Sequence, residues 1–246
     1  MTDLGHASGH GRFVHLYYNG LYFGVHDLTE RIEDDWYAEH LGGREEDWKV
    51  NKDHAVTEAR SRWNAMTNLL SSNITDNDVY EQVKDYIDLD NYIDYMFLHF
   101  YADAEDWPAK NGYGAVNEIS GDGKFRFQVW DQEIALDKFS WNRYNSSSGS
   151  GGPFQRLRRN DEFLLLFADR VHKHMFNGGA LSEGESVKRY RKIADEIDKA
   201  IVAESARWGD TQDNTPYGNT ASSSINIDAD YYPPTLNNPI YFTREQ

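Results

Sequence analysis

The sequence predicts an α+β fold, because two segments carry the pattern of β-hairpins and the longer segments around them carry the pattern of amphipathic helices. The predicted elements follow in the order hairpin, helices, polar loop, second hairpin and further helices. The chain has 246 residues, enough for one large domain or for two lobes that share a cleft. Aromatic residues make up 14% of the chain, so the side chains for a sizeable core are present.

The first hairpin is predicted over residues 12–27. Two strand-like runs, Phe13–Tyr18 and Leu21–Val25, flank the dipeptide Asn19-Gly20. Asn-Gly is the strongest short signal for a two-residue hairpin turn, since both positions tolerate a left-handed backbone. The chain is therefore expected to form an antiparallel ribbon close to its start.

Two helices are predicted between the hairpins, because apolar residues recur there at helical spacing. Asp88 or Asp90 can cap the second of these helices. That helix must end before Pro108, because proline disfavours helical geometry in the preceding residue. Asp106 is thus expected in a loop just past a buried helix. The two apolar stripes are Val56, Ala59, Trp63, Met66 and Leu70, and then Tyr92, Ile93, Met96, Phe97, Phe100 and Tyr101.

The second hairpin is predicted from residues 113–119 and 124–130, with the turn at Ser120-Gly121-Asp122-Gly123. Apolar and polar residues alternate along its second strand, which is the period of two of a half-buried strand. The alternating residues are Phe125, Phe127 and Val129 on one side and Arg126 and Gln128 on the other.

The rest of the chain is predicted to be helical and then irregular. Residues 145–152 (NSSSGSGG) have the composition of a flexible loop. Helices are expected over about 161–174 and 186–207, and residues 209–246 are polar, contain proline and are expected to form an extended tail. The expected helix faces are Leu164, Phe167 and Val171, pointing inward, and a stripe of Tyr190, Ile193, Ile197 and Ile201.

Three polar residues around the second hairpin point to phosphoryl transfer. Asp106 lies five residues before Asn111, and Asp131 follows Asn111 by twenty residues, at the far end of the hairpin. Protein kinases place a base Asp, a metal-binding Asn, two short strands and a metal-binding Asp in this order. Asp106 can accept a hydroxyl proton, while Asn111 and Asp131 offer the hard oxygen ligands that Mg²⁺ prefers. The hairpin returns its two ends to the same place, so Asn111 and Asp131 are expected to meet.

The spacing by itself is weakly specific. Asp137 and Asn142 repeat it in the same chain with no hairpin after them. A purely structural interpretation also stands, in which Asp106 caps a turn, Asn111 makes a turn hydrogen bond and Asp131 ends a strand. The order of the surrounding elements is what favours the functional interpretation.

Several sequence blocks, in the same order, resemble the CotH family, the spore coat protein H type of atypical kinase. They span roughly Gly11 to Asp210. The blocks are FVHLYYNGLYFGV from Phe13 with LTER from Leu28, DWPAKNGY from Asp106, KFRFQVWD from Lys124, FLLLFADRVHKHMFNGG from Phe163 and ESARWGD from Glu204.

The resemblance implies a diverged protein-kinase-like fold, with a partial small-lobe hairpin and a mainly helical large lobe. It implies a domain over residues 1–210 that lacks its N-terminal part, followed by a tail over residues 211–246. It also implies transfer of the γ-phosphate of ATP to Ser or Thr of a protein substrate, with Mg²⁺ or Mn²⁺. Asp106 would be the catalytic acid of the loop, Asn111 and Asp131 would bind the metal, and Glu30 would lie close to the adenine.

The sequence departs from the family pattern at two places. The family often has Trp-Asp-x-Asp where residues 130–133 read Trp-Asp-Gln-Glu, so the role of Glu133 is open. The family's phosphate-binding lysine lies on a strand upstream of the first hairpin, and Lys49 and Lys52 come after the hinge and are not assumed to replace it. Turnover by the chain as written is therefore expected to be reduced or absent.

Two alternatives remain open beside the kinase. The first is a non-catalytic module for coat or surface assembly that keeps the same scaffold. The second is a carbohydrate-active enzyme that uses Asp131 and Glu133 as a carboxylate pair.

Composition limits the partners and the chemistry. The formal net charge of −16 disfavours nucleic acid and anionic membranes as main partners, because both are negatively charged. The absence of cysteine excludes disulfides, thiolate zinc sites and thiol nucleophiles. Because residues 1–11 hold no apolar run and no stretch approaches about 20 apolar residues, neither a signal peptide nor a membrane span is expected in these residues. The compartment stays open: the cell surface or exterior if an upstream segment is missing, and the cytoplasm otherwise.

Overall fold

The computed structural model describes residues 1–52, 58–132, 134–136 and 142–208, in a mixed α/β arrangement with small antiparallel sheets. The chain divides into two compact units. The main unit comprises Met1–Gly9 and Glu30–Glu183, and the hairpin unit comprises His10–Thr29 and Gly184–Gln246. Each unit is described by itself.

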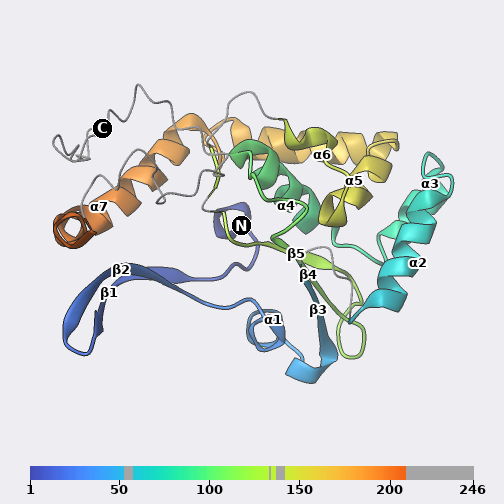
Figure 1. Ribbon diagram of the computed structural model, residues 1–246. Coiled ribbons are helices and arrows are strands. Elements are labelled where there is room, and N and C mark those ends of the chain that lie inside the picture. The colour runs from blue at the N-terminus through green and yellow to red at the C-terminus, as the bar shows by residue number, and fades with distance from the viewer. Residues whose placement is uncertain (53–57, 133, 137–141, 209–246) are drawn as a thin grey trace, which may run out of the picture. The chain divides into compact units, whose positions relative to one another are not determined.

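The hairpin unit contains the predicted first hairpin. Strand β1 (Gly11–Tyr18) pairs antiparallel with β2 (Leu21–Thr29), and Figure 1 shows the two as one twisted ribbon. Asn19 and Gly20 adopt φ values of 50° and 80° at the turn, which confirms the prediction from this dipeptide. Helix α7 (Glu183–Trp208) belongs largely to this unit, and its Glu204 Oε2 accepts a hydrogen bond of 2.7 Å from the Val25 N–H. Glu204 thereby satisfies one backbone donor of the β2 edge.

The large apolar side chains of the hairpin unit are mostly exposed among the described residues. The predicted stripe on α7 lies on one helical face, but it faces solvent along most of its length rather than a core. The exposed residues are Phe13, Leu16, Tyr17, Tyr18, Leu21, Phe23 and Leu28 of the hairpin and Val187, Tyr190, Ile193, Ile201 and Val202 of α7.

The main unit is built around a three-stranded antiparallel sheet in the order β3-β4-β5. Its second and third strands form the predicted second hairpin, while β3 was not predicted. The strands are β3 (Trp48–Lys52), β4 (Gly112–Asn117) and β5 (Arg126–Val129). The helices are α1 (Asp34–Leu41), α2 (Arg60–Ser71), α3 (Asn77–Val83), α4 (Leu89–Ala102), α5 (Gly152–Leu157) and α6 (Asp161–Met175). Short 3₁₀ turns lie at Thr2–Leu4, Glu45–Asp47, Arg143–Asn145 and Gly149–Gly151.

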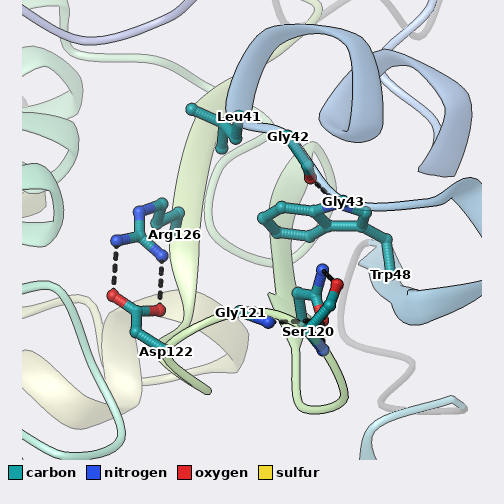
Figure 2. Close-up of a pocket in the computed structure, with 9 residues that line it drawn as sticks. Leu41, Gly42, Gly43, Trp48, Ser120, Gly121, Asp122 and Arg126 are labelled. Atoms are coloured by element: carbon teal, nitrogen blue, oxygen red, sulfur yellow. Dashed lines mark hydrogen bonds and ion pairs between the residues drawn. The ribbon is translucent and has the colours of Figure 1, made fainter.

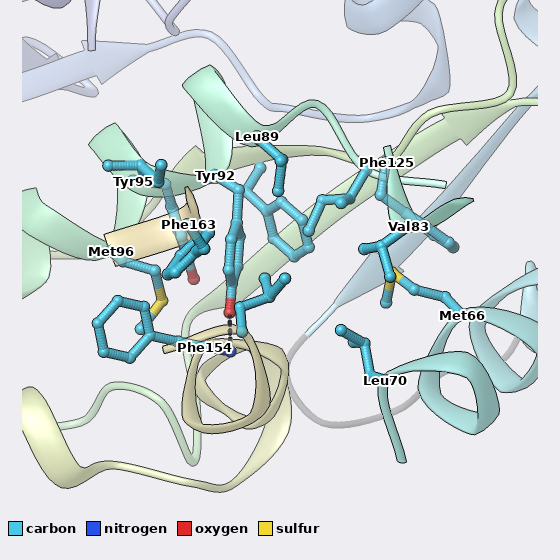
Figure 3. Packing of buried hydrophobic residues seen from close by; sticks show 14 of the residues in the cluster. Met66, Leu70, Val83, Leu89, Tyr92, Tyr95, Met96, Phe125, Phe154 and Phe163 are labelled. Carbon is cyan, nitrogen blue, oxygen red and sulfur yellow. Dashed lines mark hydrogen bonds between the residues drawn. The ribbon is translucent and has the colours of Figure 1, made fainter. Parts of the chain in front are cut away.

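Both faces of the sheet are covered, so its residues are more buried than the alternating pattern predicts. One face packs on the large apolar cluster shown in Figure 3. The other face packs on a smaller cluster in which α1 contributes Trp36 and Tyr37. Gln128, which pairs in register with Tyr113 on this second face, is consequently buried rather than exposed as the period of two suggested.

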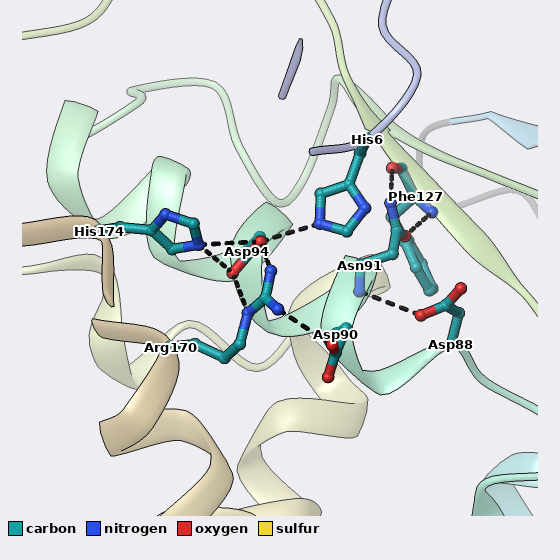
Figure 4. Close-up of polar contacts among 8 residues, drawn as sticks. All are labelled: His6, Asp88, Asp90, Asn91, Asp94, Phe127, Arg170 and His174. Carbon is teal, nitrogen blue, oxygen red and sulfur yellow. Dashed lines mark hydrogen bonds and ion pairs between the residues drawn. The ribbon is translucent and has the colours of Figure 1, made fainter. Parts of the chain in front are cut away.

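Helix α4 follows its predicted pattern closely. Asp88 is the N-cap, and its side chain accepts a hydrogen bond of 3.1 Å from the Asn91 N–H. The helix ends at Ala102, before Pro108 as expected. Asn91 then bonds the outer edge of β5 twice: its Nδ2 donates to the Phe127 carbonyl (3.1 Å), and its Oδ1 accepts from the Phe127 N–H (2.6 Å), as Figure 4 shows. One buried amide thereby takes the place of a neighbouring strand.

The segment predicted as a flexible loop contributes to the core. Ser150 is buried, and its carbonyl accepts a hydrogen bond of 2.7 Å from the Tyr92 hydroxyl. Its Oγ lies 2.9 Å from the Tyr95 hydroxyl. Glycine and serine are favoured here because their small side chains let the backbone approach the two tyrosines. A flexible loop has the same composition, so composition alone does not separate the two cases.

A buried ion-pair network joins α4 to α6 and to the start of the chain (Figure 4). Asp94 is fully buried and accepts hydrogen bonds from the Nε and Nη2 atoms of Arg170. His174 Nε2 lies 3.1 Å from each Asp94 carboxylate oxygen, and His6 Nε2 lies 2.8 Å from Oδ2. Burial raises the pKa of Asp94, but the hydrogen bonds from His6 and Arg170 outweigh it and hold the pKa below its usual range.

This network also explains why the predicted face of α6 is only partly correct: Phe167 and Val171 pack against apolar clusters as expected, but Leu164 does not. Phe163, Arg170 and His174 are the buried residues of α6, whereas Leu164, predicted to point inward, is 38% exposed. A helix face chosen from apolar residues alone leaves out Arg170. This arginine is nevertheless buried, because its guanidinium group forms an ion pair with the buried Asp94 carboxylate.

Candidate functional site

The loop that carries Asp106 is anchored from below by Trp107. The Trp107 side chain is buried, and its Nε1 donates hydrogen bonds to the Tyr95 hydroxyl (2.8 Å) and to Ser150 Oγ (3.1 Å). The Lys110 N–H bonds the Asp106 carbonyl (2.9 Å) and closes a turn above this anchor. The Asp106 side chain remains 39% exposed, and its Oδ2 lies 3.5 Å from Lys110 Nζ. The geometry therefore fixes the backbone of the loop while it leaves the carboxylate accessible.

The β4–β5 hairpin brings Asn111 and Asp131 together. Gly112 and Val129 are register partners, so the residues just outside them are neighbours. Asn111 Nδ2 donates a hydrogen bond of 3.1 Å to the Asp131 carbonyl. Both residues adopt positive φ values, 58° and 54°, which turn the chain sharply where each strand meets its loop. The expected meeting of these two residues is thus present in the structure.

The Asp106 loop lies beside the chain that follows Asp131. The Glu105 N–H donates to the Ile134 carbonyl (3.0 Å), and the Leu136 N–H donates to the Ala102 carbonyl (2.6 Å). These two backbone bonds join the segment just before Asp106 to the segment just after Asp131. The segment that carries Asp106 and the segment that follows Asp131 are therefore neighbours at the open end of the hairpin.

His99 lies beneath this region and was not singled out from the sequence. Its ring stacks on Trp107 with centroids 4.4 Å apart and planes 6° apart. Burial lowers the pKa of His99 to about 3, although the neighbouring Gln132 side chain acts in the opposite direction. The ring is therefore neutral at physiological pH. Its position four residues after Tyr95, on the buried stripe of α4, was the available signal.

The oxygen atoms of the region suit a hard divalent cation. The Asp131 carboxylate is exposed and makes no hydrogen bond or ion pair with any residue in the described ranges. Asp106 adds a second accessible carboxylate, and Asn111 adds an amide at the buried side. Carboxylate and amide oxygens, completed by water and phosphate, are the ligands that Mg²⁺ and Mn²⁺ accept. The side chains present therefore fit the metal that the sequence implied.

Comparison with known proteins agrees with the resemblance seen in the sequence. A family model described as CotH kinase protein matches residues 1–229. The chain belongs to the CotH family. A search of curated proteins returned no match. Among the residues described for this CotH chain, no helix has the length and apolar character that crossing a membrane requires.

Glu30, which the family resemblance places near the adenine, is held by two side chains in this CotH protein. Trp36 Nε1 donates a hydrogen bond of 3.1 Å to its Oε2, and His40 Nε2 lies 3.6 Å from the same oxygen. Glu133, the second carboxylate of the glycosidase alternative, lies outside the described residues, as do Val56 and Asp137.

A cavity of about 330 Å³ lies at the other end of the β4–β5 hairpin, where the turn connects the strands (Figure 2). Its polar groups bond one another. Arg126 forms two hydrogen bonds with Asp122, of 2.9 and 2.7 Å, and Trp48 Nε1 donates to the Gly42 carbonyl (2.9 Å). The cavity contains none of the three predicted site residues.

Proposed function

We propose that this CotH protein is a kinase-like phosphotransferase that moves the γ-phosphate of ATP to Ser or Thr of a protein substrate, with Mg²⁺ or Mn²⁺. The observation that supports it most strongly is the Asn111–Asp131 contact beside the Asp106 loop, with an Asp131 carboxylate that has no partner among the described residues. A diverged kinase-like fold, with a partial small lobe, is part of the same proposal.

Asp106 acts on the substrate in this proposal. Its accessible carboxylate accepts the proton of the attacking hydroxyl, and the Trp107 anchor keeps the loop in place while it does so. A divalent cation, when bound, neutralises the negative charge of the phosphates. Asn111 and Asp131 would hold that cation, and the hydrogen bond between them keeps both residues at one position.

Glu30 is proposed to lie on the adenine side of the nucleotide. Its carboxylate is oriented by the Trp36 indole, so its remaining oxygen is positioned rather than freely rotating. Glu30→Gln is expected to weaken nucleotide binding less than a change at Asp131, since an edge contact to a base involves no metal charge.

The test compares Asp131→Ala with Asp169→Asn, which removes an exposed carboxylate from α6. Transfer of phosphate from radiolabelled ATP to a mixed Ser/Thr peptide library is measured with Mn²⁺ present, together with ATP binding by calorimetry. Asp131→Ala is expected to lower transfer by about 100-fold or more, because it removes a charged group from the reacting centre. Asp169→Asn is expected to match the unchanged protein.

Two results would overturn the proposal. One is an unchanged protein that binds no ATP in the presence of either Mg²⁺ or Mn²⁺. Such a folded protein, with no nucleotide-dependent thermal shift, would favour the non-catalytic assembly module. The other is release of reducing sugar from a polysaccharide by the unchanged chain, which would favour the carbohydrate-active alternative.

A further inference from the structure

We propose that Lys52, held by Glu33, supplies the positive charge that binds the ATP phosphates next to Asn111 and Asp131. This inference rests on the proposed function. The family resemblance places the phosphate-binding lysine on a strand before the first hairpin. The structure offers a lysine on a different strand, one that is hydrogen-bonded to the strand leading out of the candidate site.

The register of the sheet puts Lys52 close to the site. Lys52 pairs with Tyr113 across β3 and β4, and Tyr113 follows Asn111 by two residues. Directly paired residues project to the same face of a sheet, and Lys52 Nζ lies 5.9 Å from the centroid of the Tyr113 ring. Tyr113 in turn contacts Trp130, with ring centroids 5.6 Å apart, and Trp130 directly precedes Asp131. Lys52 therefore shares a sheet face with the neighbours of both predicted metal ligands.

Glu33 keeps the lysine in a defined position. Lys52 Nζ donates to Glu33 Oε2, while Arg31 Nε donates to Glu33 Oε1 (2.6 Å). Burial raises the pKa of Glu33, but the hydrogen bonds from Lys52 and Arg31 outweigh it and lower the pKa overall. The carboxylate is thus ionised at neutral pH. Its bond leaves further N–H donors on the ammonium group, since a lysine carries three.

The negative charge of the region requires a cationic group for phosphate binding, and Lys52 can provide it. Asp106 and Asp131 contribute negative charge, and a triphosphate adds more, in a chain whose formal net charge is −16. Phosphoryl transfer depends on cationic groups that offset such charge, and in protein kinases a lysine held by a glutamate is one of them. Lys52 is two-thirds buried and ion-paired, whereas Lys110 is mostly exposed. Lys52 is therefore the better-positioned cation of the two.

The same strand provides a matched control. Lys49 lies three residues before Lys52, so it projects to the opposite face, and its Nζ bonds the Glu46 carbonyl (3.2 Å). Lys52→Ala, Lys52→Arg and Lys49→Ala are compared by calorimetry in the whole chain. Each protein is titrated with Mn²⁺–ATP and, separately, with adenosine, which lacks phosphates.

Lys52→Ala is expected to raise the Kd for Mn²⁺–ATP about tenfold or more and to leave the Kd for adenosine unchanged. Lys52→Arg is expected to recover part of the loss, because it keeps the charge but changes the geometry. Lys49→Ala is expected to bind both ligands like the unchanged protein. If Lys52→Ala does not fold, Lys52→Met takes its place, since methionine keeps the apolar stem beside Tyr113.

Each failure has its own signature. If the unchanged chain binds adenosine and Mn²⁺–ATP, and the Lys52 variants bind both equally well, the inference is wrong and the proposed function stands. If the Lys52 variants lose adenosine and Mn²⁺–ATP binding together, the lysine has only a structural role, and the inference is again wrong. If the unchanged chain binds no nucleotide at all, the proposed function fails and the inference fails with it.

Discussion

The two ends of the β4–β5 hairpin use polar residues in opposite ways. At the turn end, around the cavity of Figure 2, Arg126 and Asp122 bond each other, and Asn117 Oδ1 accepts hydrogen bonds from the backbone of Ser120 and Gly121. At the open end, the Asp131 carboxylate has no partner in the described ranges, and Asp106 has only a long contact with Lys110. The turn end encloses a cavity, but its polar groups already hydrogen-bond one another. The open end carries carboxylate charge that the described residues do not neutralise.

The comparison shows that a cavity in the structure need not be the place where a ligand binds and reacts. Groups that already bond one another must break those bonds before they can bind a ligand, which costs free energy. Carboxylates held on an anchored backbone, and left without partners, can take a cation without such a loss. The open end is therefore the better candidate, although the cavity lies at the turn end.

The largest effect on stability is expected from a change at Asn91, which bonds the outer edge of β5, the strand that connects the two ends of the hairpin. Asn91→Leu removes the amide that bonds the Phe127 N–H and carbonyl and leaves both backbone groups buried without partners. We expect a loss of roughly 3 kcal/mol in the free energy of unfolding, because each such group costs about 1–3 kcal/mol. Urea denaturation measures the change.

The control is Asn64→Leu, an exposed position on α2, which is expected to stay within about 0.5 kcal/mol of the unchanged protein. An Asn91→Leu protein as stable as this control would mean that the outer edge of β5 does not need a partner, and that the hairpin is held by its turn end alone.

A smaller effect is expected from His99, near the open end, which should make the free energy of unfolding depend on pH. Burial lowers the pKa of His99 to about 3, below the usual value near 6.5. Between these values the unfolded chain binds a proton that the folded chain does not, so stability falls as the pH falls. The slope from this one group is at most about 1.4 kcal/mol per pH unit.

His99→Phe keeps a ring against Trp107 and removes the titration. The free energy of unfolding, measured from pH 7.5 to pH 4.5, should therefore fall less steeply in the variant. Burial also lowers the pKa of His174, but that residue is present in both proteins and cancels in the comparison. Equal slopes in the two proteins would show that His99 is protonated in the folded state or accessible to water.

Local patterns in the sequence predicted the elements whose causes are local. The Asn19-Gly20 turn, the Asp88 cap and the apolar stripe of α4 each follow from neighbouring residues, and each is present. Helix α1 and strand β3 were missed, because they are short and their apolar residues become meaningful only when both faces of the sheet are covered. Asp34 and Asp35, which lie in the first turn of α1, are residues that favour a helix N-terminus and were the available signal for this helix.

The candidate site was predictable in part for the same reason. Asp106, Asn111 and Asp131 could be chosen because a hairpin necessarily returns its ends. His99 and the Glu33–Lys52 pair could not, since their contacts depend on a stacked ring and on the pairing of β3 with β4, which no spacing in the chain specifies.

The smallest expected effect separates the two ends most directly. Asp122→Asn removes a carboxylate that Arg126 holds, so it should lower the free energy of unfolding, but by less than about 1 kcal/mol because the Asp122 side chain is 44% exposed. Asp131→Asn removes a carboxylate that has no partner in the part of the chain that the structure describes, and it should cause no loss of stability. The Arg126 hydrogen bond holds the pKa of Asp122 at about 2. The contribution of this carboxylate to the free energy of unfolding is therefore complete above about pH 4 and disappears as the pH falls toward 2.

Chemical denaturation at pH 7 and pH 2.5 measures both differences. At pH 7 only Asp122→Asn should be less stable than the unchanged protein, while at pH 2.5 most of that difference should be gone. In the phosphate-transfer assay the order should reverse, with Asp122→Asn unchanged and Asp131→Asn impaired. If Asp131→Asn were the less stable variant at pH 7, its carboxylate would already be paired within the protein, and the distinction between the two ends of the hairpin would fail.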